Sequence, residues 1–181
     1  MTDALIVIDV QNEYVTGGLP IVHPPVEESL ARISAAIDAA AEHGVPVVLV
    51  RHSESDETGG IFVRGTPSWQ LHESVASRPH EIVIDKTLPG SFTGTDLEPW
   101  LREHDVDSLV VVGYMTHMCV DTTTRQANHL GFGVTVLDDA TGTIDVSDDL
   151  PAALVHRVEL GVLGDGFATV TSTSDWVESL G

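Results

Sequence analysis

The chain has 181 residues, a formal net charge of −20 and 42% hydrophobic residues, while aromatic residues make up only 5%. This length suits a single domain with a sizeable core, so we expect residues 1–181 to fold as one unit. The negative charge argues against binding to nucleic acid or to an anionic membrane, because both require basic patches. The apolar run at residues 4–8 is too short to span a bilayer, and no basic segment of a secretory signal precedes it. The single cysteine, Cys119, is consistent with a reducing compartment, and we expect a cytoplasmic protein.

Apolar runs and helical patterns alternate along the chain. Runs that are apolar on both faces predict buried strands at residues 4–8, 45–50, 81–85, 108–112, 133–137 and 167–171. Helical spacing and capping residues predict helices at residues 26–43, 69–76, 95–104, 120–129, 148–160 and 174–180. This alternation predicts an α/β fold, a three-layer α/β/α arrangement with a mostly parallel sheet of about six strands.

Several finer expectations concern the ends of these elements. The sequence TDLE at residues 95–98 is a capping box for the helix that follows. We expect Ser147 to cap the helix at 148–160. Asp138 and Asp139 should lie at the tip of the strand at 133–137, in capping or turn roles.

The stretch at residues 109–120 combines four apolar residues, Gly113, a short irregular link and then Cys119 directly before a helix. A helix start leaves backbone N–H groups without partners and carries a positive dipole end. A thiolate there is stabilised, so we expect the pKa of Cys119 to fall below the usual value of about 8.5. The same N–H groups can hold an oxyanion. The alternative is a buried cysteine that acts only as a small hydrophobic residue.

Two other residues directly follow predicted buried strands. Asp9 follows residues 4–8, and Lys86, the only lysine of the chain, follows residues 81–85. Open α/β sheets bind ligands at the carboxyl ends of their strands, so we expect Asp9, Lys86 and Cys119 to meet at one edge. The alternatives are a turn-forming aspartate and a solvated surface lysine.

A carboxylate, an ammonium group and a thiol are sufficient for nucleophilic acyl chemistry without a metal or another cofactor. Asp9 can take the thiol proton and return it to a leaving amine, and Lys86 can stabilise the charges of the thiolate and carboxylate. The backbone N–H groups of Met115 and Cys119 can hold the tetrahedral oxyanion. Water would then hydrolyse the thioester.

Four motifs carry a resemblance to a known family. They read LIVIDVQN at residues 5–12, DK at 85–86, SFTGTDL at 91–97 and GYMTHMCV at 113–120. Together they resemble the isochorismatase-like superfamily of cysteine hydrolases over nearly the whole chain. The resemblance implies a Rossmann-like α/β fold, the triad Asp9, Lys86 and Cys119, and a homodimer or larger oligomer. It also implies a non-proline cis peptide bond between Tyr114 and Met115 that aims the Met115 N–H into the oxyanion site.

Departures from the family patterns narrow the expected substrate. Metal-dependent nicotinamidases carry an Asp-x-His pair after the second strand, whereas residues 50–56 here read VRHSESD. No close histidine pair has ligand spacing, so we expect neither a metal nor nicotinamide as substrate. Isochorismatases that cleave a vinyl ether lack the cysteine. Cys119 therefore favours hydrolysis of a small amide, ureide or carbamoyl compound. An inactive family member that only binds its ligand, a thiol redox sensor, and isochorismatase or nicotinamidase activity are the alternatives.

Residues near the three motifs are candidates for binding the substrate, or equally for filling the core. They are Gln11, Tyr14, His52, Trp69, Phe92, Tyr114 and His117. The segment at residues 55–68 is polar and contains glycine, so we expect it to cover the substrate or to contact another subunit. Its Arg64 could meet an anionic substrate.

Overall fold

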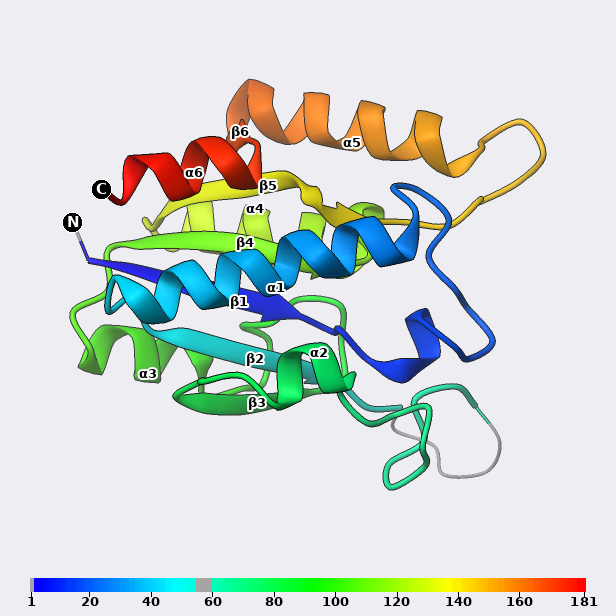
Figure 1. Cartoon of the computed structure of the whole chain (residues 1–181), viewed down its shortest axis with the longest axis horizontal. Coiled ribbons are helices and arrows are strands. Elements are labelled where there is room, and N and C mark those ends of the chain that lie inside the picture. Colours follow the sequence, from blue (N-terminus) through cyan, green and yellow to red (C-terminus); the bar gives the residue numbers. More distant parts are fainter. Residues whose placement is uncertain (1, 55–59) are drawn as a thin grey trace.

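A computed structural model describes residues 2–54 and 60–181 of the chain. A 6-stranded parallel sheet in the order β3-β2-β1-β4-β5-β6 lies between helices on both faces (Figure 1). The strands are β1 (Asp3–Ile8), β2 (Val47–His52), β3 (Ile82–Lys86), β4 (Ser108–Tyr114), β5 (Gly133–Gly142) and β6 (Thr169–Thr171). The helices are α1 (Val26–Glu42), α2 (Glu73–Ala76), α3 (Leu97–Glu103), α4 (Asp121–His129), α5 (Ala152–Gly166) and α6 (Thr173–Ser179). The predicted α/β class is confirmed, because six parallel strands flanked by helices form the observed sheet. The first part of segment 55–68 lies outside the described residues.

The central strands are apolar on both faces because two separate cores lie above and below the sheet. In β1, Leu5 and Val7 pack into the core beneath α1 and α6. Ile6 and Ile8 point the other way, into the core beneath α3, α4 and α5. A strand covered on both sides gains from burying every side chain, which explains the continuous apolar runs.

The sheet changes winding direction between β1 and β4, which are paired neighbours. Gly113 allows these two strands to approach closely. Its φ is +111°, and a Cβ atom there would lie 2.1 Å from the carbonyl oxygen of Ile8. Because β4 continues to Tyr114, the chain beyond it emerges beside Asp9, which directly follows β1.

Each strand differs from its predicted bounds, by one or two residues at an end except for β5, which is five residues longer. β2 begins two residues later than expected and ends at His52, which pairs with Lys86 of β3. β5 runs to Gly142, because its pairing with β4 shifts from Val136 to Thr141 at an irregularity. Asp138 and Asp139 therefore lie within a bent strand and not at its tip. The expected capping role holds for Asp139, whose carboxylate accepts hydrogen bonds from the backbone N–H and the hydroxyl of Thr173 at the start of α6.

Helix starts also differ from the predictions. Helix α5 begins at Ala152, whose N–H donates to Asp145 at 2.7 Å, so Ser147 does not cap it. The capping box at 95–98 does not form as predicted, since Leu97 N–H donates to the Thr95 hydroxyl and Asp96 makes no side-chain cap. Only Glu73–Ala76 of the predicted helix at 69–76 is helical. Within residues 2–54 and 60–181, no helix has the length and apolar character needed to cross a membrane.

Candidate active site

Asp9, Lys86 and Cys119 come together at the carboxyl edge of the sheet. The Lys86 Nζ atom lies 2.8 Å from Asp9 Oδ2 and donates to Cys119 Sγ at 3.3 Å. Lys86 reaches this point across β2, which separates β3 from β1. Asp9 is 0% exposed, Lys86 2% and Cys119 6%, so the thiol keeps the largest contact with solvent. A buried acid, a buried ammonium group and a thiol thus form one cluster, joined by an ion pair and a hydrogen bond.

Backbone geometry aims Asp9 into this cluster. Its φ is +51°, a left-handed conformation that aspartate adopts more readily than most residues. Its N–H donates to Val50 O and its carbonyl accepts from Gln11 N–H. These bonds hold the turn after β1 in a conformation of the kind that recurs at functional sites.

The thiol of Cys119 is protonated at rest. Burial raises its pKa above the ordinary value, the Asp9 carboxylate raises it further, and Lys86 opposes both effects. The expected depressed pKa is therefore wrong. Cys119 lies in a π-helical turn, Thr116–Val120, before α4 begins at Asp121, so it does not occupy the start of the long helix. Asp9 is the acceptor placed to remove its proton.

Lys86 is held in its charged form by its neighbours. Burial alone would lower its pKa, but the Asp9 carboxylate and the Cys119 sulfur raise it above the ordinary value. Lys86 Nζ also donates to Leu88 O at 3.1 Å and lies 3.3 Å from His52 Nδ1. The pKa of His52 is lowered, first by burial and then by Lys86, so its ring is neutral and accepts this bond.

The link between β4 and Cys119 is compact. The peptide bond between Tyr114 and Met115 is cis. The Met115 carbonyl accepts hydrogen bonds from Met118 N–H at 3.0 Å and Val120 N–H at 3.2 Å. This closed turn brings the Cys119 side chain to Lys86.

Aromatic rings border the cluster on the side of β2. Tyr14 is 3% exposed, and burial followed by Asp9 and Cys119 raises its pKa. Phe62 packs against Tyr14 with 5.1 Å between ring centroids and against His52 with 5.4 Å. Phe62 is not predicted from the sequence, because it lies in a polar segment without periodicity. Its being the one large aromatic residue among residues 55–68 was the available signal.

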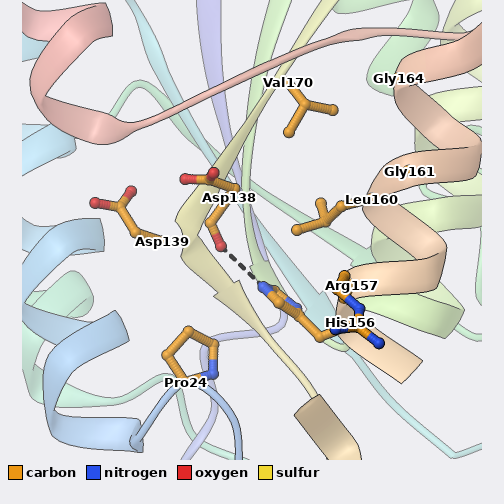
Figure 2. Close-up of a pocket in the computed structure, with 9 residues that line it drawn as sticks. All are labelled: Pro24, Asp138, Asp139, His156, Arg157, Leu160, Gly161, Gly164 and Val170. Atoms are coloured by element: carbon orange, nitrogen blue, oxygen red, sulfur yellow. Dashed lines mark hydrogen bonds between the residues drawn. The ribbon is translucent and has the colours of Figure 1, made fainter. Parts of the chain in front are cut away.

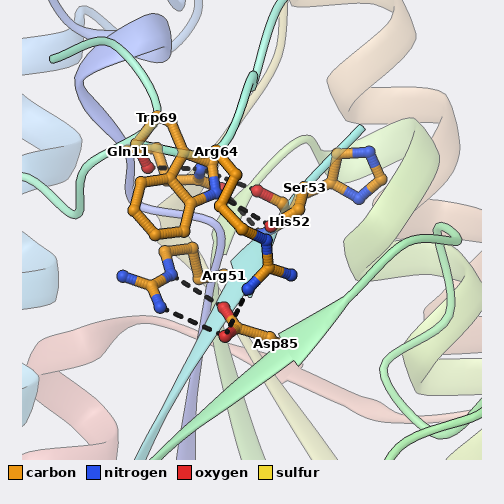
Figure 3. Close-up of polar contacts among 7 residues, drawn as sticks. All are labelled: Gln11, Arg51, His52, Ser53, Arg64, Trp69 and Asp85. Carbon is orange, nitrogen blue, oxygen red and sulfur yellow. Dashed lines mark hydrogen bonds and ion pairs between the residues drawn. The ribbon is translucent and has the colours of Figure 1, made fainter. Parts of the chain in front are cut away.

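Gln11 and Trp69 belong to a network of polar contacts around the end of β2 (Figure 3). Gln11 is 0% exposed, and its amide nitrogen donates to His52 O at 3.0 Å and to Trp69 O at 2.7 Å. The Arg51 guanidinium stacks 3.8 Å from the Trp69 ring centroid and pairs with Asp85 at 2.8 Å. Trp69 Nε1 donates to Ser53 Oγ at 2.8 Å. Both candidates therefore fasten the chain around residue 69 to β2, which explains why their side chains are unavailable to a substrate.

Three other candidates make contacts with residues outside the cluster. Phe92 stacks on Phe132 with ring centroids 6.0 Å apart. Tyr114 is 0% exposed, and its hydroxyl lies 2.8 Å from Ser29 Oγ of α1, so it is a core residue. His117 contacts the Thr143 hydroxyl and lines a groove along α5. A place beside a motif residue in the sequence does not predict where a side chain lies. The packing of the neighbouring helices and strands decides this.

Arg64, a candidate for meeting an anionic substrate, is exposed and pairs with Asp85 at 3.5 Å. Within the part of the chain that the structure describes, no group of three or more His, Cys, Asp or Glu side chains is arranged to hold a metal ion.

We expect the substitution Gln11→Leu to lower the free energy of unfolding by about 2–3 kcal/mol, because buried backbone groups of His52 and Trp69 lose their partners. Denaturant unfolding measures this change. Gln70→Leu, at an exposed position nearby, is the control and should stay within about 0.5 kcal/mol of the wild type. Equal stability of the two variants would show that the hydrogen bonds of Gln11 contribute nothing to the free energy of unfolding.

The fold and the site define a parallel α/β protein with a buried acid, ammonium and thiol cluster at the point where the sheet changes direction. The chain belongs to the isochorismatase family: the isochorismatase domain matches residues 3–175. The isochorismatase family protein YddQ of Bacillus subtilis strain 168, described as uncharacterized, is 36% identical over 98% of this chain and 100% of its own length.

Two solved structures and a further sequence relative agree with this assignment. A crystal structure from Burkholderia xenovorans LB400 has 45% identity and a TM-score of 0.95, covering 99% of this chain and 87% of that one. A cysteine hydrolase from Pseudomonas syringae has 28% identity and a TM-score of 0.90, covering 99% and 92%. A ureidoacrylate amidohydrolase, RutB of Rhizobium rhizogenes K84, is 26% identical over 94% of this chain and 84% of its own length.

Proposed function

We propose that the protein is a cysteine hydrolase that cleaves the C–N bond of a small amide, ureide or carbamoyl compound. The observation that carries this proposal is the position of Lys86 Nζ, which forms an ion pair with the Asp9 carboxylate and donates a hydrogen bond to the Cys119 sulfur. The family's cysteine hydrolase and amidohydrolase members support the reaction class.

In the proposed mechanism, Asp9 removes the Cys119 proton as the sulfur attacks the substrate carbonyl carbon. Lys86 stabilises the negative charge that the thiol acquires, which is required because the resting pKa of the thiol is raised. The Met115 and Cys119 N–H groups are proposed to hold the oxyanion. The tetrahedral intermediate then collapses. The C–N bond breaks, Asp9 returns the proton to the leaving amine, and a thioester on Cys119 remains.

Hydrolysis of this thioester completes the cycle. Water enters the position that the amine has left, Asp9 takes one of its protons, and the oxygen attacks the thioester carbonyl carbon. The C–S bond breaks, and the thiol recovers its proton from Asp9 as the acid leaves. Cys119 must not be oxidised between turnovers, because only the free thiol can attack the next substrate, and this favours a reducing compartment such as the cytoplasm.

Ammonia or amine release from the purified protein tests this function. The panel contains aryl amides, carbamoyl amino acids, biuret and ureidoacrylate-like compounds. It also contains nicotinamide, whose hydrolysis would favour the alternative nicotinamidase activity. Acid quenching during turnover should trap an acyl group on Cys119, seen by mass spectrometry. If no compound is hydrolysed but one binds tightly, an inactive binding protein becomes the better interpretation.

We also propose that a second copy of the chain covers an exposed apolar face formed by α5 and the segment that precedes it. Val146, Leu150 and Val158 are 51%, 46% and 53% exposed around a cavity of about 350 Å³. Glu159 also lines this cavity, and its pKa is raised to about 7 by burial and then by Asp121. Burial of these exposed apolar side chains between two copies would stabilise the contact against the repulsion expected of a chain with net charge −20.

Light scattering after size-exclusion chromatography tests this arrangement. The wild type should be a dimer or larger, and Val158→Asp should shift it to the monomer mass. Val22→Asp is the control, because Val22 is 50% exposed and does not line the cavity. A monomeric wild type would refute the arrangement.

A further inference from the structure

The turn that carries Cys119 is held from outside the site by one histidine. Thr116, the first residue of the π-helical turn, is 0% exposed. Its hydroxyl lies 2.9 Å from His156 Nδ1 of α5. His156 is 6% exposed and lies far from the turn in sequence. This contact is therefore a tertiary tie between α5 and the turn.

The bonding of His156 determines its tautomer. Its Nε2 lies 3.1 Å from the backbone carbonyl of Asp138, beside the groove drawn in Figure 2. A carbonyl oxygen only accepts, so Nε2 carries the proton and Nδ1 accepts from the Thr116 hydroxyl. Burial, followed by the nearby His23 ring, lowers the pKa of His156 to about 4. The ring is therefore neutral near pH 7, with both nitrogens engaged.

Thr116 directly follows the residue whose N–H is proposed to hold the oxyanion. The same Met115 residue accepts two hydrogen bonds through its carbonyl from within the turn, from Met118 and Val120. A rotation of Thr116 would thus move Met115 and the Cys119 backbone together. Two side-chain contacts can oppose this rotation: the Thr116 hydroxyl with His156 of α5, and the His117 ring with Thr143 just after β5.

We propose that His156 is a positioning residue, which fixes the Met115–Cys119 backbone in the conformation that stabilises the oxyanion. This inference rests on the proposed function. His156 does not reach the reacting atoms, so its effect is expected on kcat rather than on KM. It connects the bulged part of β5, through the Asp138 carbonyl, to the turn that carries the nucleophile.

The test compares His156→Phe, Thr116→Val and the double variant in the full chain. His156→Phe keeps a ring but removes both hydrogen bonds. We expect kcat to fall roughly tenfold to a hundredfold with KM within about twofold, because a misplacement of about 1 Å can cost on the order of a hundredfold. The double variant should be no worse than either single one, since both remove the same contact. Thr116→Ser should recover most of the activity, and His129→Phe, at an exposed position, should have no effect.

Hydrogen exchange of the peptide covering residues 115–120 gives a readout that does not depend on turnover. It should become faster in His156→Phe and Thr116→Val, while exchange in β1 stays unchanged. Unchanged exchange in these variants, or effects on kcat that multiply in the double variant, would overturn the inference. If the wild type hydrolyses no amide, the proposed function fails on its own, and the exchange data decide whether His156 positions the turn.

Discussion

Replacing Cys119 with alanine should reduce amide hydrolysis by roughly 10⁴-fold or more in kcat, because the residue proposed to form the covalent intermediate is removed. The fold should persist. Cys119 is a small side chain at the edge of one core, so its loss should cost about 1 kcal/mol of stability. Steady-state release of ammonia or amine measures the activity, and thermal unfolding measures the stability.

Met118→Ala is the matched control for this experiment. Met118 belongs to the same turn but is 41% exposed, and its truncation should leave kcat within about threefold. Full activity of Cys119→Ala on a substrate that the wild type hydrolyses would contradict the covalent mechanism. It would leave Asp9 as a base that activates water directly.

The substitution Asp9→Asn should change turnover and thiol reactivity in opposite directions. Turnover should fall roughly 10²- to 10⁴-fold, because the amide cannot carry a proton from the thiol to the leaving amine. The thiol should become more reactive, since the Asp9 carboxylate raises the pKa of Cys119 and Lys86 lowers it. Without the carboxylate, we expect alkylation by iodoacetamide at neutral pH to be roughly tenfold faster, which corresponds to about one pKa unit.

Mass spectrometry of the alkylated protein measures this rate against pH, and the midpoint should move to lower pH in Asp9→Asn. Lys86→Met is the opposing control, because loss of the ammonium group should raise the pKa of the thiol further and slow alkylation. A midpoint for Asp9→Asn that is unchanged or higher would show that Asp9 does not control the thiol. Slow alkylation of the wild type does not by itself indicate an inactive binding protein, because the raised pKa of Cys119 keeps the resting thiol protonated.

Part of this site could be predicted from local sequence chemistry. Buried parallel strands are recognised by runs that are apolar on both faces, and the residue after such a strand stands at the edge where ligands bind. This rule predicts Asp9 and Lys86 as site residues, Lys86 is also the only lysine of the chain, and the family motifs imply the same pair. Their meeting with Cys119 followed from the expected topology, because the carboxyl ends of parallel strands lie on one side of the sheet.

Other features depended on packing between elements that are distant in sequence. The pKa of Cys119 is raised and not lowered, because the cysteine lies in a buried turn beside a carboxylate and not at the start of a solvated helix. Phe62 reaches His52 and Tyr14 only because the chain around residue 69 is fastened to β2 by Gln11 and Arg51.

Residue type and periodicity predict the strands, and they predict Asp9, Lys86 and Cys119 at or beyond the strand ends. Both are local properties of the chain. The direction of Trp69, Phe92, Tyr114 and His117, and the contact of His156 with Thr116, were decided in the folded protein. Each of these side chains takes the orientation that satisfies its hydrogen bonds and fills its core, and the partners come from elsewhere in the chain.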